Sequence, residues 1–163
     1  MRAFIIGVVS FLSFSCTAEG VTVRDPNGEF SFLADDAPEE EREESGKVLW
    51  AFGAVRVAAQ RVPRTSYNRG LSLAEVAAAL SERFEFEDIE GSVEASPCTA
   101  DGRAIQCLDG WTESESGRVQ RRGLLFGSDD ELVLVEVIGD GGRVDEVFER
   151  LLQSFRWPGE LDG

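Results

Sequence analysis

The chain has 163 residues and a formal net charge of −15, from 16 Lys and Arg against 31 Asp and Glu, which fits one modest acidic domain. It contains no histidine, which excludes a Ser-His-Asp triad, a Cys-His pair, a histidine zinc site and a histidine-ligated haem. The isoelectric point near 4.3 argues against nucleic acid as a partner, because phosphate binding depends on Lys and Arg.

The chain begins with a predicted export signal. Arg2 supplies one positive charge, and residues 3–14 (AFIIGVVSFLSF) follow without any charge. This run has the length of a secretory h-region and is too short for a membrane-spanning helix, which needs ~20 apolar residues. Cys16 then resembles the acylated cysteine of a bacterial lipobox: Ser15 before it fits, whereas Ser13 stands where leucine is usual. We expect lipidation of Cys16 and a place in the cell envelope, facing the periplasm or the surface. Cleavage elsewhere nearby, or a buried N-terminal strand, is the alternative.

Removal of a signal over residues 1–15 leaves a polar tether over 16–28, in which a short strand is expected at 21–23. A single domain is expected over 29–158, with a tail over 159–163. The first strands predicted in the domain are residues 30–33, 47–54 and 55–62, from their apolar patterns.

Residues 35–44 lie between the first two of these strands, and seven of the ten are acidic. A run of like charge usually marks a solvated loop or an exposed strand flank. The functional alternatives are a docking strip for a basic partner and a weak Ca²⁺ site.

A helix is predicted from Ser72 to about residue 85. Ser72 and Glu75 have the spacing of a capping box, and Leu71 and Val76 that of a hydrophobic staple. A second amphipathic helix is predicted over 144–155, before Trp157 and Pro158 stop it. Strands are predicted between the two helices at 92–96, 104–112, 118–126 and 132–138.

The breaks between these later strands are short, which favours antiparallel neighbours, since parallel pairs need long crossovers. The sequence therefore predicts an α+β fold: a twisted antiparallel sheet with two main helices packed on it.

Cys98 and Cys107 are predicted to form a disulfide across a hairpin. Placing them directly opposite each other requires a four-residue loop at 101–104, whereas a tight turn at Asp101 and Gly102 places Cys98 opposite Ile105. The two features predict different registers, and we favour the disulfide with the longer loop. Redox chemistry is not expected, because redox pairs usually occur as Cys-x-x-Cys at a helix start.

The basic residues Arg118, Arg121 and Arg122 form the densest cationic cluster, and with Trp157 they are the candidate partner contacts. Strand alternation places Arg121 on the face opposite Arg118 and Arg122. The arginines either solubilise an outer strand and pair with nearby acids or contact an anionic partner.

Other candidate sites are weaker. Residues 139–143 resemble an anion nest before a helix, but a strand-to-helix turn is the simpler interpretation. Asp129, Asp130 and Glu131 lack the spacing of an EF-hand loop. A glycosidase-like carboxylate pair needs a cleft that shifts one pKa, which a chain this small is not expected to supply; the acids concerned are Glu85, Glu87, Asp88 and Glu90. We predict no enzyme activity, no catalytic residue, no cofactor and no metal site.

Three segments resemble the PsbP-like fold family, which includes the photosystem subunit PsbP, a Ran-binding nuclear import factor and many small bacterial lipoproteins. Residues 28–32 (GEFSF), followed by Pro38, resemble its opening strand, and residues 57–63, ending in Val-Pro, resemble its next landmark. Residues 147–156 resemble its terminal helix, which often ends in Ser-Phe. The resemblance implies an α/β/α sandwich and a binding or assembly role without catalysis. The cysteine pair is not a general feature of that family.

The sequence thus favours a lipid-anchored envelope protein that docks on another envelope protein or stabilises a complex. The alternatives are an exported protein that binds a small ligand or Ca²⁺ and, less favoured, a carboxylate-based hydrolase.

Overall fold

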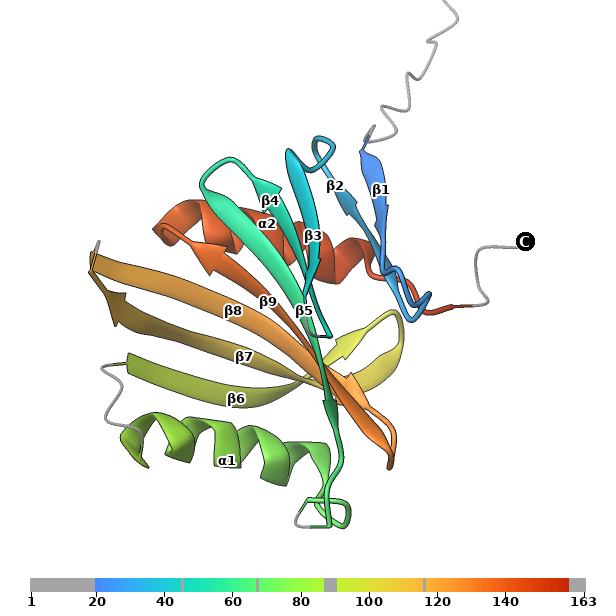
Figure 1. Ribbon diagram of the computed structural model, residues 1–163, viewed down its shortest axis with the longest axis vertical. Coiled ribbons are helices and arrows are strands. Elements are labelled where there is room, and N and C mark those ends of the chain that lie inside the picture. Colours follow the sequence, from blue (N-terminus) through green and yellow to red (C-terminus); the bar gives the residue numbers. More distant parts are fainter. Residues whose placement is uncertain (1–19, 45, 67, 87–90, 116, 159–163) are drawn as a thin grey trace, which may run out of the picture.

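The computed structural model describes residues 20–158 except residues 45, 67, 87–90 and 116 (Figure 1). Seven strands form one antiparallel sheet in the order β3-β4-β5-β9-β8-β7-β6, and β1 pairs with β2 in a separate hairpin. The strands are β1 (Val21–Arg24), β2 (Ser31–Ala34), β3 (Glu40–Glu44), β4 (Lys47–Phe52), β5 (Val55–Pro63), β6 (Gly91–Ala100), β7 (Arg103–Ser114), β8 (Gly117–Gly127) and β9 (Glu131–Gly139), and the helices are α1 (Leu73–Phe86) and α2 (Gly141–Ser154). The predicted α+β class is therefore confirmed.

The two helices pack on opposite faces of the sheet. Successive strand residues point to opposite faces, and in β8 Leu124 belongs to the core beneath α2 whereas Leu125 belongs to the cluster beneath α1. α2 contacts β2, β5, β8 and β9, whereas α1 contacts β6, β7 and β8. The larger core thus lies between α2, the β1–β2 hairpin and the sheet, as Figure 1 shows. Of the described helices, neither has the length and apolar character needed to span a bilayer.

The start of α1 is confirmed as a capping box. The Ser72 backbone N–H donates to Glu75 Oε2 at 2.7 Å, and the Glu75 N–H donates to Ser72 Oγ at 3.3 Å. Hydrogen bonds from the Ser72 side chain and backbone stabilise the charged carboxylate and lower the pKa of Glu75. Leu71 packs against the cluster that contains Val76, as the staple requires.

The β6–β7 hairpin contains both the disulfide and the tight turn. Asp101 and Gly102 have φ values of 47° and 75°, so a two-residue turn places Cys98 opposite Ile105. The predicted four-residue loop was therefore wrong. The Cys98–Cys107 disulfide is nevertheless present. Cys107 lies two residues after Ile105 and therefore on the same face of β7, diagonally across from Cys98. The Cα atoms of the two cysteines are 5.7 Å apart, which a disulfide can span. A loop of about ten residues closed in this way stabilises a fold by ~2–3 kcal/mol.

The β1–β2 hairpin lies partly within the segment expected to be a tether. The strand expected at 21–23 is confirmed as β1, and Val23 is buried. Asp25 in the hairpin turn forms a 2.5 Å ion pair with Arg61 of β5, and its side chain is fully buried. Glu29 pairs with the same guanidinium at 3.0 Å. The hairpin is therefore held to the main sheet by a partly buried ion pair as well as by apolar contacts.

This ion pair gives a stability prediction. Replacing Asp25 with Asn leaves the half-buried Arg61 without its closest counter-charge, and removing one partner of a buried pair costs about 3 kcal/mol. We expect D25N to lower the urea midpoint strongly without changing the slope of the unfolding transition. The control is E29Q, which removes a more exposed carboxylate from the same arginine and should cost less than ~1 kcal/mol. Equal losses from the two variants would contradict the assignment.

Candidate functional site

Two of the three clustered arginines tie elements of the fold together. The Arg122 guanidinium contacts Asp145 at 3.2 Å and Glu149 at 3.0 Å, and it lies 4.2 Å from the centre of the Phe148 ring. These three partners belong to α2, so Arg122 fastens that helix to β8. Arg121 pairs with Glu136 of β9 at 3.2 Å. The predicted alternation of faces is confirmed, because Arg122 faces α2 and Arg121 faces away from it.

Arg118 has a different environment. Its guanidinium lies 3.6 Å from the centre of the Trp111 ring and forms no ion pair with any residue that the structure describes. Arg118 is exposed and Trp111 is half-buried. A cavity of about 320 Å³ adjoins them, and its wall is completed by Asp109, Gly110, Gln120 and Gly141. We call these six residues the Trp111–Arg118 surface. The sequence predicted Arg118 as a candidate contact, and the register of β7 against β8 places Trp111 beside it.

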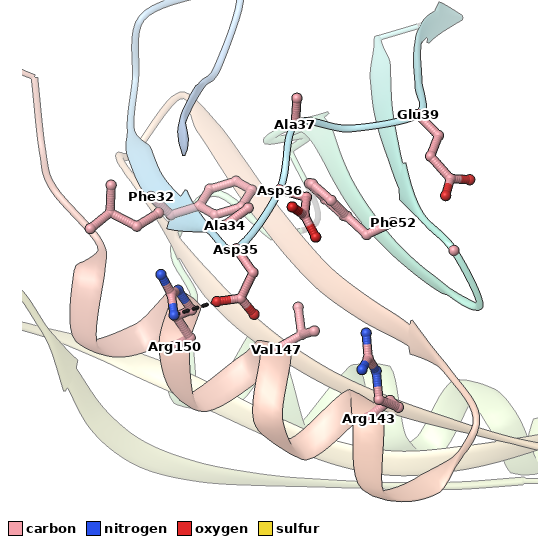
Figure 2. A pocket seen from close by; sticks show the side chains of 12 residues that line it. Phe32, Ala34, Asp35, Asp36, Ala37, Glu39, Phe52, Arg143, Val147 and Arg150 are labelled. Carbon is pink, nitrogen blue, oxygen red and sulfur yellow. Dashed lines mark ion pairs between the residues drawn. The ribbon is translucent and has the colours of Figure 1, made fainter. Parts of the chain in front are cut away.

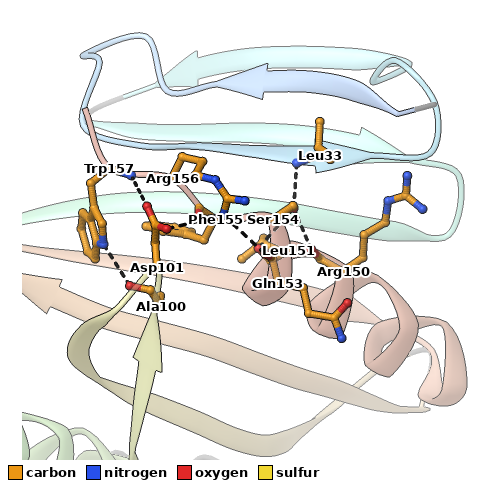
Figure 3. A network of polar contacts seen from close by, with 10 residues as sticks. All are labelled: Leu33, Ala100, Asp101, Arg150, Leu151, Gln153, Ser154, Phe155, Arg156 and Trp157. Carbon is orange, nitrogen blue, oxygen red and sulfur yellow. Dashed lines mark hydrogen bonds and ion pairs between the residues drawn. The ribbon is translucent and has the colours of Figure 1, made fainter. Parts of the chain in front are cut away.

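Trp157 is a buried residue. Its side chain is 6% exposed, its indole Nε1 donates to the Ala100 carbonyl at 2.9 Å, and its ring meets Phe126 edge-on at 4.9 Å. Figure 3 shows the indole turned toward the β6–β7 turn, where Asp101 also accepts from the Trp157 backbone N–H. Trp157 is therefore corrected from a candidate partner contact to a core residue. The partner role of the arginines stays a prediction.

The acidic run divides into two parts. Asp35 pairs with Arg150 of α2 at 2.5 Å. Residues 40–44 form β3, an edge strand of the sheet, where charged side chains oppose unwanted strand pairing. Within the described part of the chain, no three or more Asp, Glu, Cys or His side chains are placed to hold a metal ion. The Ca²⁺ alternative therefore has no preformed site there.

The remaining candidates are placed as follows. Residues 139–143 form a strand-to-helix turn, with Asp140 at the N-cap of α2. Asp130 pairs with Arg69 at 3.7 Å. Cys16, Glu87, Asp88 and Glu90, and the side chain of Glu85, lie outside the described residues, so the lipidation and hydrolase hypotheses are not tested by the structure.

Sequence reasoning missed a pocket between α2 and the β2–β3 linker (Figure 2). It has a volume of about 300 Å³ and combines aromatic and aliphatic side chains with charges of both signs. Arg143, Val147 and Arg150 have the i, i+4, i+7 spacing of one helix face, which was a usable signal. Their pairing with the acidic linker depends on the tertiary fold, so the sequence alone did not indicate it.

A second missed cavity, of about 260 Å³, lies between α1 and the sheet. Its lining is almost wholly apolar and includes Val62, Leu71, Val76, Leu80, Leu132 and Leu134. Val62 is 39% exposed, so the cavity opens to solvent beside it.

No family model matches the chain, and no curated protein matches it by sequence. Its fold, however, is similar to that of cyanobacterial PsbP (CyanoP) from Synechocystis sp. PCC 6803, with a TM-score of 0.60 and 12% identity over 93% of this chain and 98% of that one. The chain has a PsbP-like fold. The Ran-binding protein Mog1p of Saccharomyces cerevisiae is also similar, with a TM-score of 0.55 and 10% identity over 85% of this chain and 95% of that one. A protein from Bacteroides thetaiotaomicron matches with a TM-score of 0.52 and 13% identity, over 86% of this chain and 49% of that one. The resemblance found in the sequence is thus confirmed at the level of the fold.

The environments of the three tryptophans predict how their fluorescence is quenched. Trp50 is 0% and Trp157 is 6% exposed, whereas Trp111 is half-buried. Acrylamide should therefore quench mainly Trp111, and W111F should lose most of the quenchable emission. W157F serves as the matched control and should keep it. A W111F protein quenched as strongly as the parent would contradict the placement of Trp111 at the surface.

Proposed function

We propose that this chain is a non-catalytic interaction module of the bacterial cell envelope, held at the membrane by a lipid on Cys16, that docks on another envelope protein. The observation that carries the proposal is the Trp111–Arg118 surface. Tryptophan and arginine are the residues most enriched among binding hot spots, and they act where a pocket lets them be desolvated by the partner. Here the pair adjoins a cavity, and Arg118 has no carboxylate partner among the described residues.

The positive charge of Arg118 indicates which kind of partner group it contacts. A guanidinium that lies over an aromatic ring can still donate its N–H groups to a carboxylate. The partner is therefore expected to present an acidic side chain at this point, although the net charge of −15 works against a broadly acidic partner. Among the proteins with a similar fold, Mog1p is a Ran-binding protein, so the fold is compatible with protein binding.

The location is supported by the cysteines. A disulfide such as Cys98–Cys107 persists in oxidising compartments and is rare in the cytosol. The chain has three cysteines, and acylation of Cys16 would account for the one that the disulfide leaves over.

Docking is tested by site-specific photocrosslinking in the membranes of the native host. A crosslinker at Glu113, an exposed residue on the same face as Trp111, should give one discrete adduct. R118E and W111A should each abolish it. R56E is the matched control, because it makes the same charge change at an exposed arginine on the opposite face, and it should leave the adduct unchanged. An adduct that survives R118E and W111A would contradict docking at this surface.

Anchoring is tested by the intact mass of protein extracted from membranes, with and without reductant. We expect a chain that begins at Cys16 and carries acyl groups, and that gains the mass of two hydrogens on reduction. C16S should release the protein from the membrane fraction. A full-length unmodified chain with three free thiols would overturn both the location and the disulfide.

A further inference from the structure

The pocket between α2 and the β2–β3 linker has an apolar interior. Phe32 of β2, Phe52 at the end of β4 and Val147 of α2 contribute to its lining, together with Ala34. Figure 2 shows Phe52 and Val147 extending into the space between the linker and the helix. At about 300 Å³ the pocket is at the small end of ligand sites. It therefore suits a molecule the size of an amino acid or dipeptide.

Charges of both signs line the same pocket without neutralising one another completely. Arg150 is occupied by Asp35, at 2.5 Å. Arg143, two helical turns earlier, forms no ion pair with any described residue, and neither do the side chains of Asp36 and Glu39. In Figure 2 Arg143 rises from α2 toward the linker, and the Asp36 carboxylate points back toward the helix. A cation and two carboxylates are therefore left to pair with a guest.

The charge balance selects the kind of guest. The lining holds three carboxylates and two guanidinium groups, so a simple anion would meet net negative charge in a chain that is already strongly acidic. A simple cation would leave Arg143 unpaired beside it. A molecule with both charges can pair with the free guanidinium and with the free carboxylates of the pocket. A guanidinium binds a carboxylate in a bidentate manner, and a carboxylate accepts hydrogen bonds from an ammonium group.

We infer that this pocket binds a small zwitterion with an apolar side chain, such as leucine or a short apolar peptide. The ligand's carboxylate meets Arg143, its ammonium group meets Asp36 with Glu39 nearby, and its side chain lies against Phe52 and Val147. This site is formed by other residues than the Trp111–Arg118 surface, so it stands independently of the proposed docking function.

The test is a titration of the ¹⁵N-labelled protein with L-leucine and with the dipeptide Ala-Leu, followed by NMR. We expect saturable shifts centred on Gly53 and Val147, with a dissociation constant of about 1 mM or below for at least one of the two. N-acetylleucine lacks the ammonium group and leucinamide lacks the carboxylate. Each should bind at least about tenfold more weakly than leucine.

Two variants test the residues directly. R143Q and D36N change exposed side chains and should keep the fold, as judged by an unchanged thermal midpoint, while each weakens binding at least about tenfold. R56Q is the control and should bind as the parent does, and W111A should also leave zwitterion binding unchanged. Absence of saturable shifts up to about 10 mM of either zwitterion, equal binding of N-acetylleucine, or binding that survives R143Q would each overturn the inference.

Discussion

The rest of the fold depends on how Phe155 packs. Its side chain lies between the β1–β2 hairpin, the sheet and the last described residues of the chain. Its ring is fully buried, stacks on Phe30 with centroids 5.3 Å apart and meets Phe126 edge-on at 5.6 Å. Directly after it, Ser31 and Arg156 exchange two backbone hydrogen bonds of 3.0 and 2.9 Å. One short segment thus joins α2, the β1–β2 hairpin and the sheet, and it also carries Trp157 into the core. The Ser154 hydroxyl accepts from the Leu33 N–H at 2.9 Å and fixes β2 along the helix (Figure 3).

This constraint explains what the sequence could and could not predict. The helices and most strands follow from local patterns: the capping box at Ser72 and the apolar spacing of α2 depend on neighbours within a few residues. Trp157 was misplaced because its burial depends on Ala100 and Phe126, which are distant in the chain. The hairpin register was misjudged because direct opposition of the cysteines was assumed, whereas a diagonal disulfide fits the tight turn. The pocket was missed because its two walls come from segments about a hundred residues apart.

The same contacts explain how so acidic a chain uses its few cations. Arg61, Arg121, Arg122 and Arg150 each bridge separate elements through carboxylates. In Arg61, burial alone would lower the pKa, but hydrogen bonding to and attraction by Asp25 and Glu29 outweigh it and raise the pKa further above the physiological range. These four arginines therefore maintain the fold rather than contact a partner. Arg118 and Arg143 differ from these four arginines because they lack a carboxylate partner in the described structure. They also differ from an exposed arginine such as Arg56, because each of them borders a cavity.

Both candidate sites adjoin the first turn of α2. Gly141 lines the cavity beside Trp111, and Arg143 lines the pocket beside the linker. The first turn itself holds no acidic residue, and Asp140 stands at the N-cap directly before it. Further along the helix, Arg122 fastens α2 to β8, and Ser154 with Phe155 fastens it to the hairpin. A helix held at these points keeps Gly141 and Arg143 in fixed positions relative to β7, β8 and the linker. The stability of the α2 packing and the geometry of both sites are therefore consequences of the same contacts, and a change in those contacts would alter the two sites together.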